Sequence, residues 1–341
     1  MQLGLFDYSD RMEKIDRNKD PLVRLNQLIN WEQFRSTLET VRIKDRKSSA
    51  GRKPHDVVLI FKILILQSLY NLADDAIEFQ ILDRLSFMRF LGLGIESKVP
   101  DSKTIWLFRG QLSQANLLDR LFTEFDTFLR ENGFEAKAGQ AIDATIIPVP
   151  IQRNSREENK QIKEGKTPEE WQKDDKQTKN KLAQKDLDAR WTKKNGKSHY
   201  GYKNHISIDI KFKLIRKQKV TSASVHDSQI FIGLLDSQNT NGDVYADSAY
   251  ASEEHDRALE LLNYRPRIIK KACKNKKLTT NEQKGNRTKS KKRSRVEHVF
   301  GAQLTKMETA IVRFIGQARV KAALELRNLT YNLCRYTVLK G

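Results

Sequence analysis

Apolar residues recur at helical spacing through residues 1–132 of the chain. In the segment 117–131, apolar side chains repeat at four-residue intervals, from Leu117 to Leu129. The segment 57–70 is apolar on nearly every face, so it predicts the central buried helix of a bundle. The stop signal Glu131-Asn132-Gly133 ends this pattern. The sequence therefore predicts an all-α N-terminal domain over residues 1–135.

From Gly139 onward the pattern changes to that of strands. Between residues 200 and 210, side chains of one parity are mostly apolar and those of the other mostly polar, which predicts a half-exposed strand. The pattern predicts further strands at 142–149, 214–220, 243–247 and 267–269, and helices at 228–235, 252–262 and around residue 297. Strands followed by alternating helices and strands indicate a mixed sheet covered on both faces. The sequence therefore predicts an α/β domain over residues 136–341.

Two strongly charged segments interrupt this α/β domain. Residues 151–198 form a charged insertion, in which Thr167-Pro168-Glu169-Glu170 predicts the start of a helix. The segment 265–295 has 14 Lys or Arg residues and one acid, Glu282. We expect it to be mobile without DNA, because it has too few apolar residues to bury a core. The two segments carry most of the formal net charge of +20, which favours a nucleic-acid partner.

Membrane and secretory functions are disfavoured by the sequence. The longest apolar run, 57–69, contains Lys62 and Gln67 and is too short to span a bilayer. The first residues lack the charged start and long apolar stretch of a signal peptide. The two cysteines form neither a zinc pattern nor a disulfide framework. We therefore expect a protein of the reducing cytoplasm that associates with the nucleoid and with no membrane.

Three acidic residues lie where buried elements have no structural use for a charge. Asp143 interrupts an apolar strand, Asp247 ends a shorter one, and Glu297 lies near the start of an amphipathic helix. A charge at the edge of a core is costly unless it is paired or bound to a cation. Two aspartates and a glutamate can hold two Mg²⁺ ions about 4 Å apart for in-line attack on a phosphodiester. Their ordinary carboxyl pKa values, near 4, would leave them ionised at pH 7.

Each of the three acids also has a purely structural interpretation. Asp143 can pair with a core arginine, Asp247 can cap the helix that follows, and Glu297 can pair with Arg293 one turn earlier. We interpret Asp227 as a helix cap. Other acids near strand ends compete for the same role, namely Asp209 and Asp243. The combination of two strand aspartates and one helix glutamate nevertheless favours a metal site.

Several motifs occur in a fixed order along the chain. They are Ile-Asp-Ala-Thr at 142–145, a segment at 189–205 that ends in Gly-Tyr-Lys-Asn-His, Val-His-Asp-Ser-Gln at 225–229, Tyr-Ala-Asp-Ser-Ala-Tyr at 245–250 and Arg-Val-Glu-His-Val-Phe-Gly at 295–301. Together they resemble the DDE transposases of bacterial insertion sequences, and among these the insertion-sequence-five family. Residues 51–54 and 100–106 are similar to the N-terminal helical domain of that family.

The resemblance implies a ribonuclease H-like catalytic core joined to an N-terminal helical DNA-binding domain. It also implies two Mg²⁺ ions, which Mn²⁺ can replace, with Asp143, Asp247 and Glu297 as catalytic residues and metal ligands. Arg293 matches the arginine that the family carries four residues before the glutamate. The family's tyrosine and basic residue are replaced by Ser290 and Leu304, and Lys306 is the candidate substitute for the basic one.

The resemblance further implies action on double-stranded DNA by a homodimer or higher oligomer. The candidate DNA contacts are basic and aromatic side chains, namely Lys103, Arg109, Lys197, Tyr202, Lys203, Lys291, Lys292, Arg293, Arg295 and Lys306. The predicted enzyme binds the terminal inverted repeats of its own insertion sequence, cleaves at the element ends and joins the 3′-hydroxyl to target DNA by two-metal nucleotidyl transfer. The alternatives are a metal-dependent DNA nuclease and a catalytically decayed DNA-binding regulator.

Overall fold

The protein divides into two compact units. The computed structural model describes residues 7–42, 54–168, 171–172, 175–272, 277–307, 312 and 314–341, apart from the side chains of residues 7, 8 and 306. The first unit comprises Met1–Leu129, Lys306–Glu308 and Glu325–Gly341, and the second comprises Arg130–Thr305 and Thr309–Leu324. The functional boundary between residues 135 and 136 stays a prediction.

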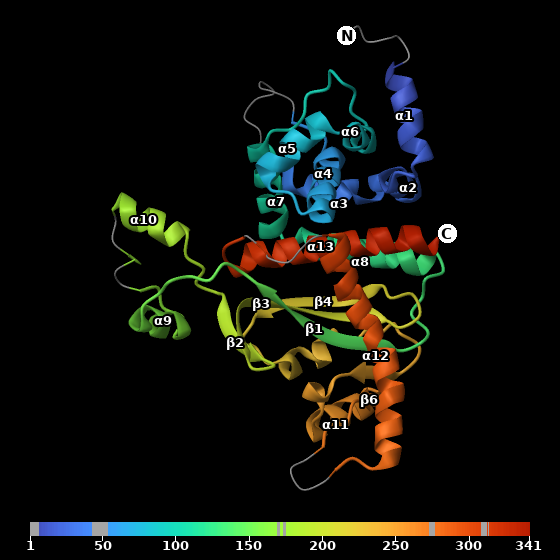
Figure 1. Ribbon diagram of the computed structural model, residues 1–341, viewed down its shortest axis with the longest axis vertical. Coiled ribbons are helices and arrows are strands. Elements are labelled where there is room, and N and C mark those ends of the chain that lie inside the picture. Colours follow the sequence, from blue (N-terminus) through green and yellow to red (C-terminus); the bar gives the residue numbers. More distant parts are fainter. Residues whose placement is uncertain are drawn as a thin grey trace. The chain divides into compact units, whose positions relative to one another are not determined.

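The first unit is helical (Figure 1). Its α-helices are α1 (Asp7–Arg17), α2 (Pro21–Leu28), α3 (Arg35–Glu39), α4 (Val57–Tyr70), α5 (Asp74–Asp83), α6 (Leu85–Leu91), α7 (Ser102–Gln114), nearly all of α8 (Leu117–Glu131) and the second half of α13 (Gln317–Leu339). Ten residues of α4 are buried, and its Phe61 packs edge-on against Phe34 with 5.2 Å between ring centres. Asp56 caps α4 by accepting the backbone N–H groups of Val58 and Leu59. The predicted N-terminal helical region is confirmed.

The length and hydropathy of the helices show whether any of them could span a membrane. Among the described residues, no single helix is long and apolar enough to cross a bilayer. Of the helices that the structure describes, α4 and α5 are together long and apolar enough, but they are bent by 101° relative to each other.

The second unit contains a mixed sheet, as predicted, but it has six strands where the pattern indicated five. Its strands are β1 (Gln140–Pro148), β2 (Arg190–Lys194), β3 (Lys197–Asp209), β4 (Ile215–Ser222), β5 (Asp243–Ala246) and β6 (Arg265–Ile268). The strand order is β2-β3-β1-β5-β6, and β4 pairs with β3. β1 is antiparallel to β3 but parallel to β5, and β5 is parallel to β6. The central strand β1 therefore lies between an antiparallel neighbour, β3, and a parallel neighbour, β5.

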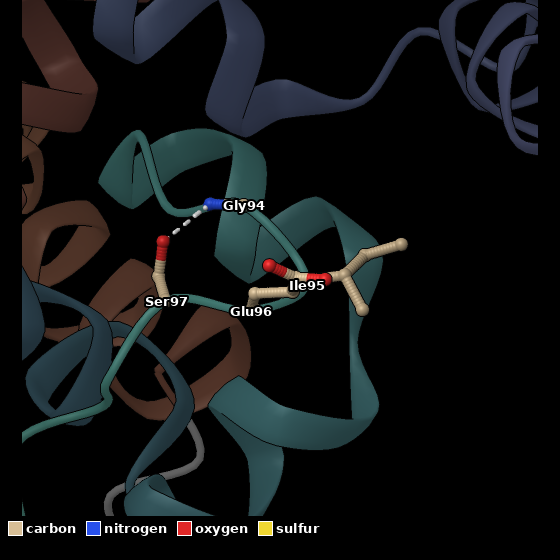
Figure 2. Close-up of a pocket in the computed structure, with 4 residues that line it drawn as sticks. All are labelled: Gly94, Ile95, Glu96 and Ser97. Atoms are coloured by element: carbon tan, nitrogen blue, oxygen red, sulfur yellow. Dashed lines mark hydrogen bonds between the residues drawn. The ribbon is translucent and has the colours of Figure 1, made fainter.

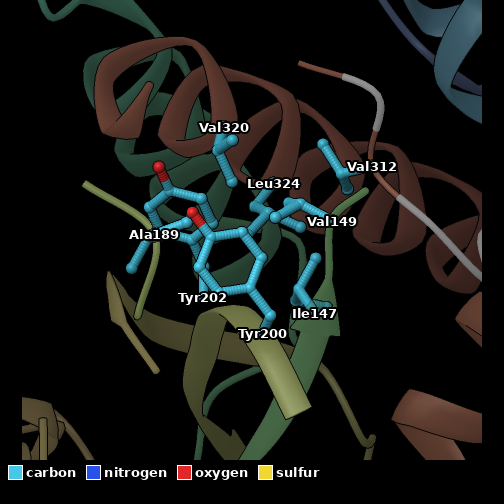
Figure 3. Close-up of a cluster of buried hydrophobic side chains, with 9 residues drawn as sticks. Ile147, Val149, Ala189, Tyr200, Tyr202, Val312, Val320 and Leu324 are labelled. Carbon is cyan, nitrogen blue, oxygen red and sulfur yellow. The ribbon is translucent and has the colours of Figure 1, made fainter. Parts of the chain in front are cut away.

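Apolar clusters cover both faces of this sheet. The unit's helices are α9 (Arg156–Lys163), α10 (Lys176–Ala183), α11 (Glu253–Leu261), α12 (Thr280–Lys306), the first half of α13, and the 3₁₀ helices η4 (Asp227–Ile230), η5 (Ile232–Leu234) and η6 (Ser248–Tyr250). Ile142 and Ile147 on β1 point to opposite faces, because side chains alternate along a strand. Ile142 packs in a cluster with Phe231 and Leu259. Ile147 packs in the other cluster, with Leu324 of α13 (Figure 3).

Two predictions for strands and helices were wrong. β3 is buried without interruption from Tyr200 to Asp209, not half-exposed. It lies between β1 on one side and β2 and β4 on the other, with clusters above and below, so its polar residues are buried too. The predicted helix at 228–235 is instead the pair of short 3₁₀ helices η4 and η5.

The described parts of the basic segment, residues 265–272 and 277–295, also have more regular secondary structure than the composition indicated. They contain β6 and the first part of α12, which starts at Thr280. Thr279 and Glu282 form a capping box: the Thr279 hydroxyl accepts the Glu282 N–H, and Glu282 accepts the Thr279 N–H. A second capping box, Ser155 with Glu158, starts α9 in the charged insertion. The predicted box at 167–170 falls partly outside the described residues, and the next helix, α10, begins at Lys176.

Candidate active site

Asp143 and Asp247 are brought together by the parallel pairing of β1 with β5. Gln140 pairs with Val244 and Ala141 with Tyr245. Continuing this register by two residues places Asp143 opposite Asp247, which directly follows β5. Neighbouring strands lie about 4.8 Å apart, and residues at matching positions point to the same face. The two carboxylates therefore start from adjacent positions on one face of the sheet.

Glu297 approaches this face from α12 through an arginine. One guanidinium nitrogen of Arg293 lies 2.6 Å from Asp143 Oδ2, and another binds Glu297 Oε1. Arg293 lies one helical turn before Glu297, so a single side chain links the strand acid to the helix acid. The Glu297 side chain keeps 51% of its surface exposed, whereas those of Asp143 and Arg293 keep 17% and 16%. The acid cluster thus has a buried side and an open side.

All three structural alternatives for the acids occur in this one place. Asp143 and Glu297 both pair with Arg293, and Asp247 caps η6 by accepting the Ser248 N–H at 2.6 Å. Helix caps and ion pairs of this kind also occur singly in many proteins. Their convergence at the end of a parallel strand pair is what distinguishes this cluster from scattered structural contacts.

Burial changes the titration of Asp143. Removal from water raises the pKa of Asp143 to about 6, although the Ala144 N–H, Arg293 and Lys194 favour the ionised form. The expectation of an ordinary pKa near 4 is therefore wrong for this residue. The carboxyl group is still mostly ionised at pH 7, as a metal ligand must be.

Tyr250 is a feature of the site that the sequence reasoning missed. Its side chain is 1% exposed, and its hydroxyl has no hydrogen-bond partner among the described residues. Burial raises the pKa of Tyr250 strongly, and the nearby charges of Asp143, Asp227 and Asp247 raise it further. The hydroxyl thus lies within electrostatic range of three aspartates. Its only signal in the sequence is its place in the motif Tyr-Ala-Asp-Ser-Ala-Tyr, three residues after Asp247.

The competing acids have other partners. Asp209 is fully buried and pairs with Arg216 at 3.2 Å. Asp243 pairs with two arginines of β6 at 2.8 and 3.1 Å. Asp227 lies 2.8 Å from Lys203 Nζ, and the cap of η4 is the ring of His226, so the interpretation of Asp227 as a helix cap was wrong. Of the strand-end acids, Asp143 and Asp247 remain as candidates for a shared ligand site.

Three predicted DNA contacts are occupied by protein groups. Arg109 binds both carboxylate oxygens of Asp74 at 2.7 Å. Tyr202 is fully buried and its hydroxyl donates to Asp186 at 2.7 Å. Lys203 is also buried and donates to the Val225 carbonyl at 2.8 Å, besides its ion pair with Asp227. The burial of β3 explains the last two cases, and all three side chains are bound to protein groups where contact with DNA was predicted.

The other predicted DNA contacts differ in their accessibility. Lys103, Lys197, Lys291 and Lys292 are exposed. Arg295 donates to the carbonyl of Ile210, and Arg293 is held by the acids. The side chain of Lys306 lies outside the described residues. Contact with DNA stays a prediction for these positions, and the exposed lysines of α12 and β3 are the strongest candidates.

The donor set at the site suits a hard divalent cation. Carboxylate oxygens are the preferred ligands of Mg²⁺. Arg293 already places a positive group between Asp143 and Glu297, so this position stabilises positive charge. Among the described residues no group of three His, Cys, Asp or Glu side chains is arranged around one ion position. Glu297 would therefore have to exchange Arg293 for the ion in order to join the two aspartates.

A cavity in the first unit carries no comparable chemistry. The loop Gly94, Ile95, Glu96 and Ser97 borders a space of about 510 Å³ (Figure 2). The Ser97 hydroxyl accepts the Gly94 N–H at 2.9 Å and so closes the loop on itself. Among the described residues that line the cavity, Glu96 is the one acid and none is basic, and the Ser97 hydroxyl is already bound by the Gly94 N–H.

Comparison with known proteins identifies the family of this α/β protein. Residues 135–333 match the family model of the transposase DDE domain, and residues 9–111 match a second transposase domain model, DUF772. The chain therefore belongs to the DDE transposases of insertion-sequence type. It is also similar to a chain in the cryo-EM structure of the piggyBac transposase synaptic complex with hairpin DNA, at 12% identity and a TM-score of 0.46, over 94% of this chain and 76% of the other. Members of this family generally use divalent metal ions.

Proposed function

We propose that this transposase binds the terminal inverted repeats of its own insertion sequence, cleaves at the element ends and joins the freed 3′-hydroxyl to target DNA. The observation that carries this proposal is the position of Asp143 opposite Asp247, with Glu297 linked to Asp143 through Arg293. The element is assigned to the insertion-sequence-five family, and the catalytic core to the ribonuclease H-like fold. Because its substrate is the chromosome, the enzyme would act in the cytoplasm at the nucleoid.

The acids of this site would hold two divalent ions, Mg²⁺ or Mn²⁺. Asp143, Asp247 and Glu297 would hold these ions. When bound, such ions activate a water molecule or a 3′-hydroxyl and stabilise the leaving oxygen. Ala144 donates its N–H to Asp143 Oδ1 at 2.8 Å and so fixes the orientation of that carboxylate. Arg293, once displaced from the acids, would be free to bind a phosphate oxygen.

Recognition of the element ends is assigned to the helical unit, and the charge of the second unit to general contact with DNA. Lys103 is an exposed residue near the start of α7, where a recognition helix would present it to a groove. A homodimer or higher oligomer would be needed to hold two element ends at once. This division of labour rests on the family match over both parts of the chain.

A cleavage and strand-transfer assay tests the proposed chemistry. Asp143→Asn, Asp247→Asn and Glu297→Gln each keep the side-chain shape but lose the charge that binds metal. We expect each variant to lose Mg²⁺-dependent cleavage and joining of oligonucleotide ends while it still binds them. Asp243→Asn is the matched control. Asp243 lies on β5, the strand that leads to Asp247, but its carboxylate pairs with arginines of β6. Near-normal cleavage by one of the three variants would remove that residue from the site.

The same assay separates the remaining functions. A wild-type protein that cleaves but never joins is a nuclease. A protein that binds the ends with neither reaction is a regulator derived from a transposase.

A further inference from the structure

A basic groove lies between the end of β1 and the β2–β3 hairpin. Its volume is about 490 Å³, and it is lined by Thr145, Ile146 and Pro148 of β1 and by Lys194, Asn195, Lys197 and His199 of the hairpin. We call it the hairpin groove. Among the described residues that line it, none is acidic, and their polar groups are two ammonium groups, an imidazole, an amide and a hydroxyl. This combination suits the oxygens of phosphate groups and gives no binding site for a cation.

The hairpin forces the two lysines of the groove together. Asn195 and Gly196 have positive φ angles, 51° and 76°, as in the tight two-residue turn of a type I′ hairpin. Lys194 and Lys197 flank this turn and are direct cross-strand partners. Like charges in this position are destabilising, and neither lysine takes part in an ion pair of the described residues. An anion bound between them would relieve the repulsion.

The hairpin groove lies next to the candidate active site along β1. Thr145 follows Asp143 by two positions on β1, so the two side chains point to the same face and start roughly 7 Å apart. Lys194 is close enough to Asp143 for its charge to favour the ionised carboxylate. A strand of nucleic acid held at Asp143 would therefore place its neighbouring phosphates at Thr145 and the hairpin lysines.

We propose that the hairpin groove binds the phosphates of one DNA strand directly beside the phosphodiester that the enzyme cuts. A groove of about 490 Å³ has room for a short stretch of one strand. Lys194 and Lys197 contact the phosphates, and Asn195 and His199 add hydrogen bonds. This inference rests on the proposed transposase function, since it assigns a subsite to that reaction.

Oligonucleotides of different length test the subsite. Duplexes that carry the element end would be trimmed step by step on either side of the cleaved phosphate, and their affinity for the full-length protein measured with Ca²⁺ in place of Mg²⁺. We expect Lys194→Ala and Lys197→Ala each to weaken binding about tenfold for substrates that extend into the groove, as for the loss of one charge-assisted contact. For substrates trimmed on that side, each variant should equal wild type. In cleavage assays with Mg²⁺, the KM of each variant should likewise be raised only for the substrates that extend into the groove.

Two further variants serve as controls. Lys193→Ala removes a positive charge from the same strand, but residue 193 faces the other side of the hairpin. We therefore expect this variant to bind every substrate as wild type does. Lys194→Arg keeps the charge and should retain the affinity for long substrates. Thermal melting of each variant checks that the hairpin stays folded.

The outcomes separate this inference from the proposed function. The subsite would be overturned if Lys194→Ala lost equal affinity for long and trimmed substrates, or if Lys193→Ala lost as much affinity as Lys194→Ala. Either result would do so even if wild type cleaves and joins. Conversely, a length-dependent deficit in binding would support the subsite even if wild type showed no cleavage, a result that would count against the transposase reaction alone.

Discussion

The hydroxyl of Tyr250 is buried beside three aspartates without a hydrogen-bond partner among the described residues. An unsatisfied buried polar group costs about 1–3 kcal/mol, so Tyr250→Phe should melt at the same or a higher temperature than wild type. If the hydroxyl donates to a ligand of the site, the same substitution should slow cleavage by roughly 10- to 100-fold, the worth of one hydrogen bond to a charged group. Cleavage rates and melting curves of one protein sample measure both effects.

A matched tyrosine distinguishes these effects. Tyr245 lies on β5, five residues before Tyr250, and its hydroxyl donates to Asp243 at 3.5 Å, away from the acid pair. Tyr245→Phe should therefore leave cleavage unchanged. Unchanged cleavage in Tyr250→Phe as well would mean that this hydroxyl serves no ligand.

Lys62 is a buried charge in the core of the helical unit. Its ammonium group donates to Asn26 at 2.9 Å and lies 4.6 Å from the ring centre of Phe90. Burial nevertheless lowers the pKa of Lys62 from 10.5 to about 8. Between these two pH values the unfolded chain holds a proton that the folded protein has released, so the free energy of unfolding rises with pH. The rise is at most about 1.4 kcal/mol for each unit of pKa shift.

Lys62→Met should remove this pH dependence and should be at least as stable as wild type at pH 7, where the charge is still buried. Urea unfolding of both proteins at pH 7 and pH 10 measures the difference. Parallel stability curves for the two proteins would show that the hydrogen bond to Asn26 and the aromatic rings compensate fully for burial.

At the scale of single residues, the three acids could be singled out as candidates, because Asp143 interrupts an apolar strand, Asp247 ends one and Glu297 lies near the start of an amphipathic helix. The double ion pair of Arg293 and the burial of Tyr250 could not, since both depend on which elements meet in space. The same limit explains Arg109: its spacing on α7 fits a recognition helix, but the partner Asp74 comes from α5. Local sequence contains no sign of that partner.

At the scale of elements, the order of strands and helices followed from periodicity, whereas the exposure of β3 did not. Alternating polar residues predicted one solvated face, yet buried polar side chains on β3 have partners inside the protein, as His205 has in Thr221. The helix around residue 297 was predicted, but the first part of α12, from Thr280 onward, was missed because its charge density was taken as a sign of mobility. The capping box at Thr279 and Glu282 was the sequence signal that outweighed it.

The exposed side of α12 carries a basic stripe. Lys284, Arg287 and Lys291 are exposed and spaced i, i+3 and i+7, so they lie on one face of the helix that leads to Glu297. Replacing all three with alanine should weaken binding to every DNA sequence alike. It should also flatten the slope of log K against log salt by up to about 3, because each phosphate contact contributes about 0.9.

The control for the stripe keeps its charge. A variant with arginine at positions 284 and 291 should retain the wild-type salt slope, which is measured by fluorescence anisotropy between 50 and 200 mM salt. An unchanged slope in the triple alanine variant would show that the stripe faces solvent or a partner subunit. Two further lysines of the same segment, Lys274 and Lys276, lie outside the described residues.

At the scale of the whole molecule, the first unit is completed by the end of the chain. The segment Glu325–Gly341 belongs to that unit, and its Tyr336 packs against Phe125 and Phe128 at 6.2 and 5.5 Å between ring centres. Periodicity along the chain cannot reveal such a pairing, because the two segments are separated by the entire α/β unit. The sequence therefore assigned these last residues to the catalytic domain together with the rest of α13.

Because of this arrangement, the end point of a fragment decides whether the α/β unit stays soluble by itself. A fragment of residues 130–341 would expose side chains of α13 that the first unit buries, among them Leu326, Leu329 and Leu333, and should aggregate. A fragment of residues 130–324 keeps Val320 and Leu324, which fill the cluster around Ile147, and should stay soluble and folded. It should bind DNA weakly and without preference for the element's ends, because the proposed end-recognition helices are absent. Size-exclusion chromatography and footprinting test both statements: a monodisperse longer fragment would refute the packing argument, and full end specificity in the shorter one would refute the assignment of end recognition to the helical unit.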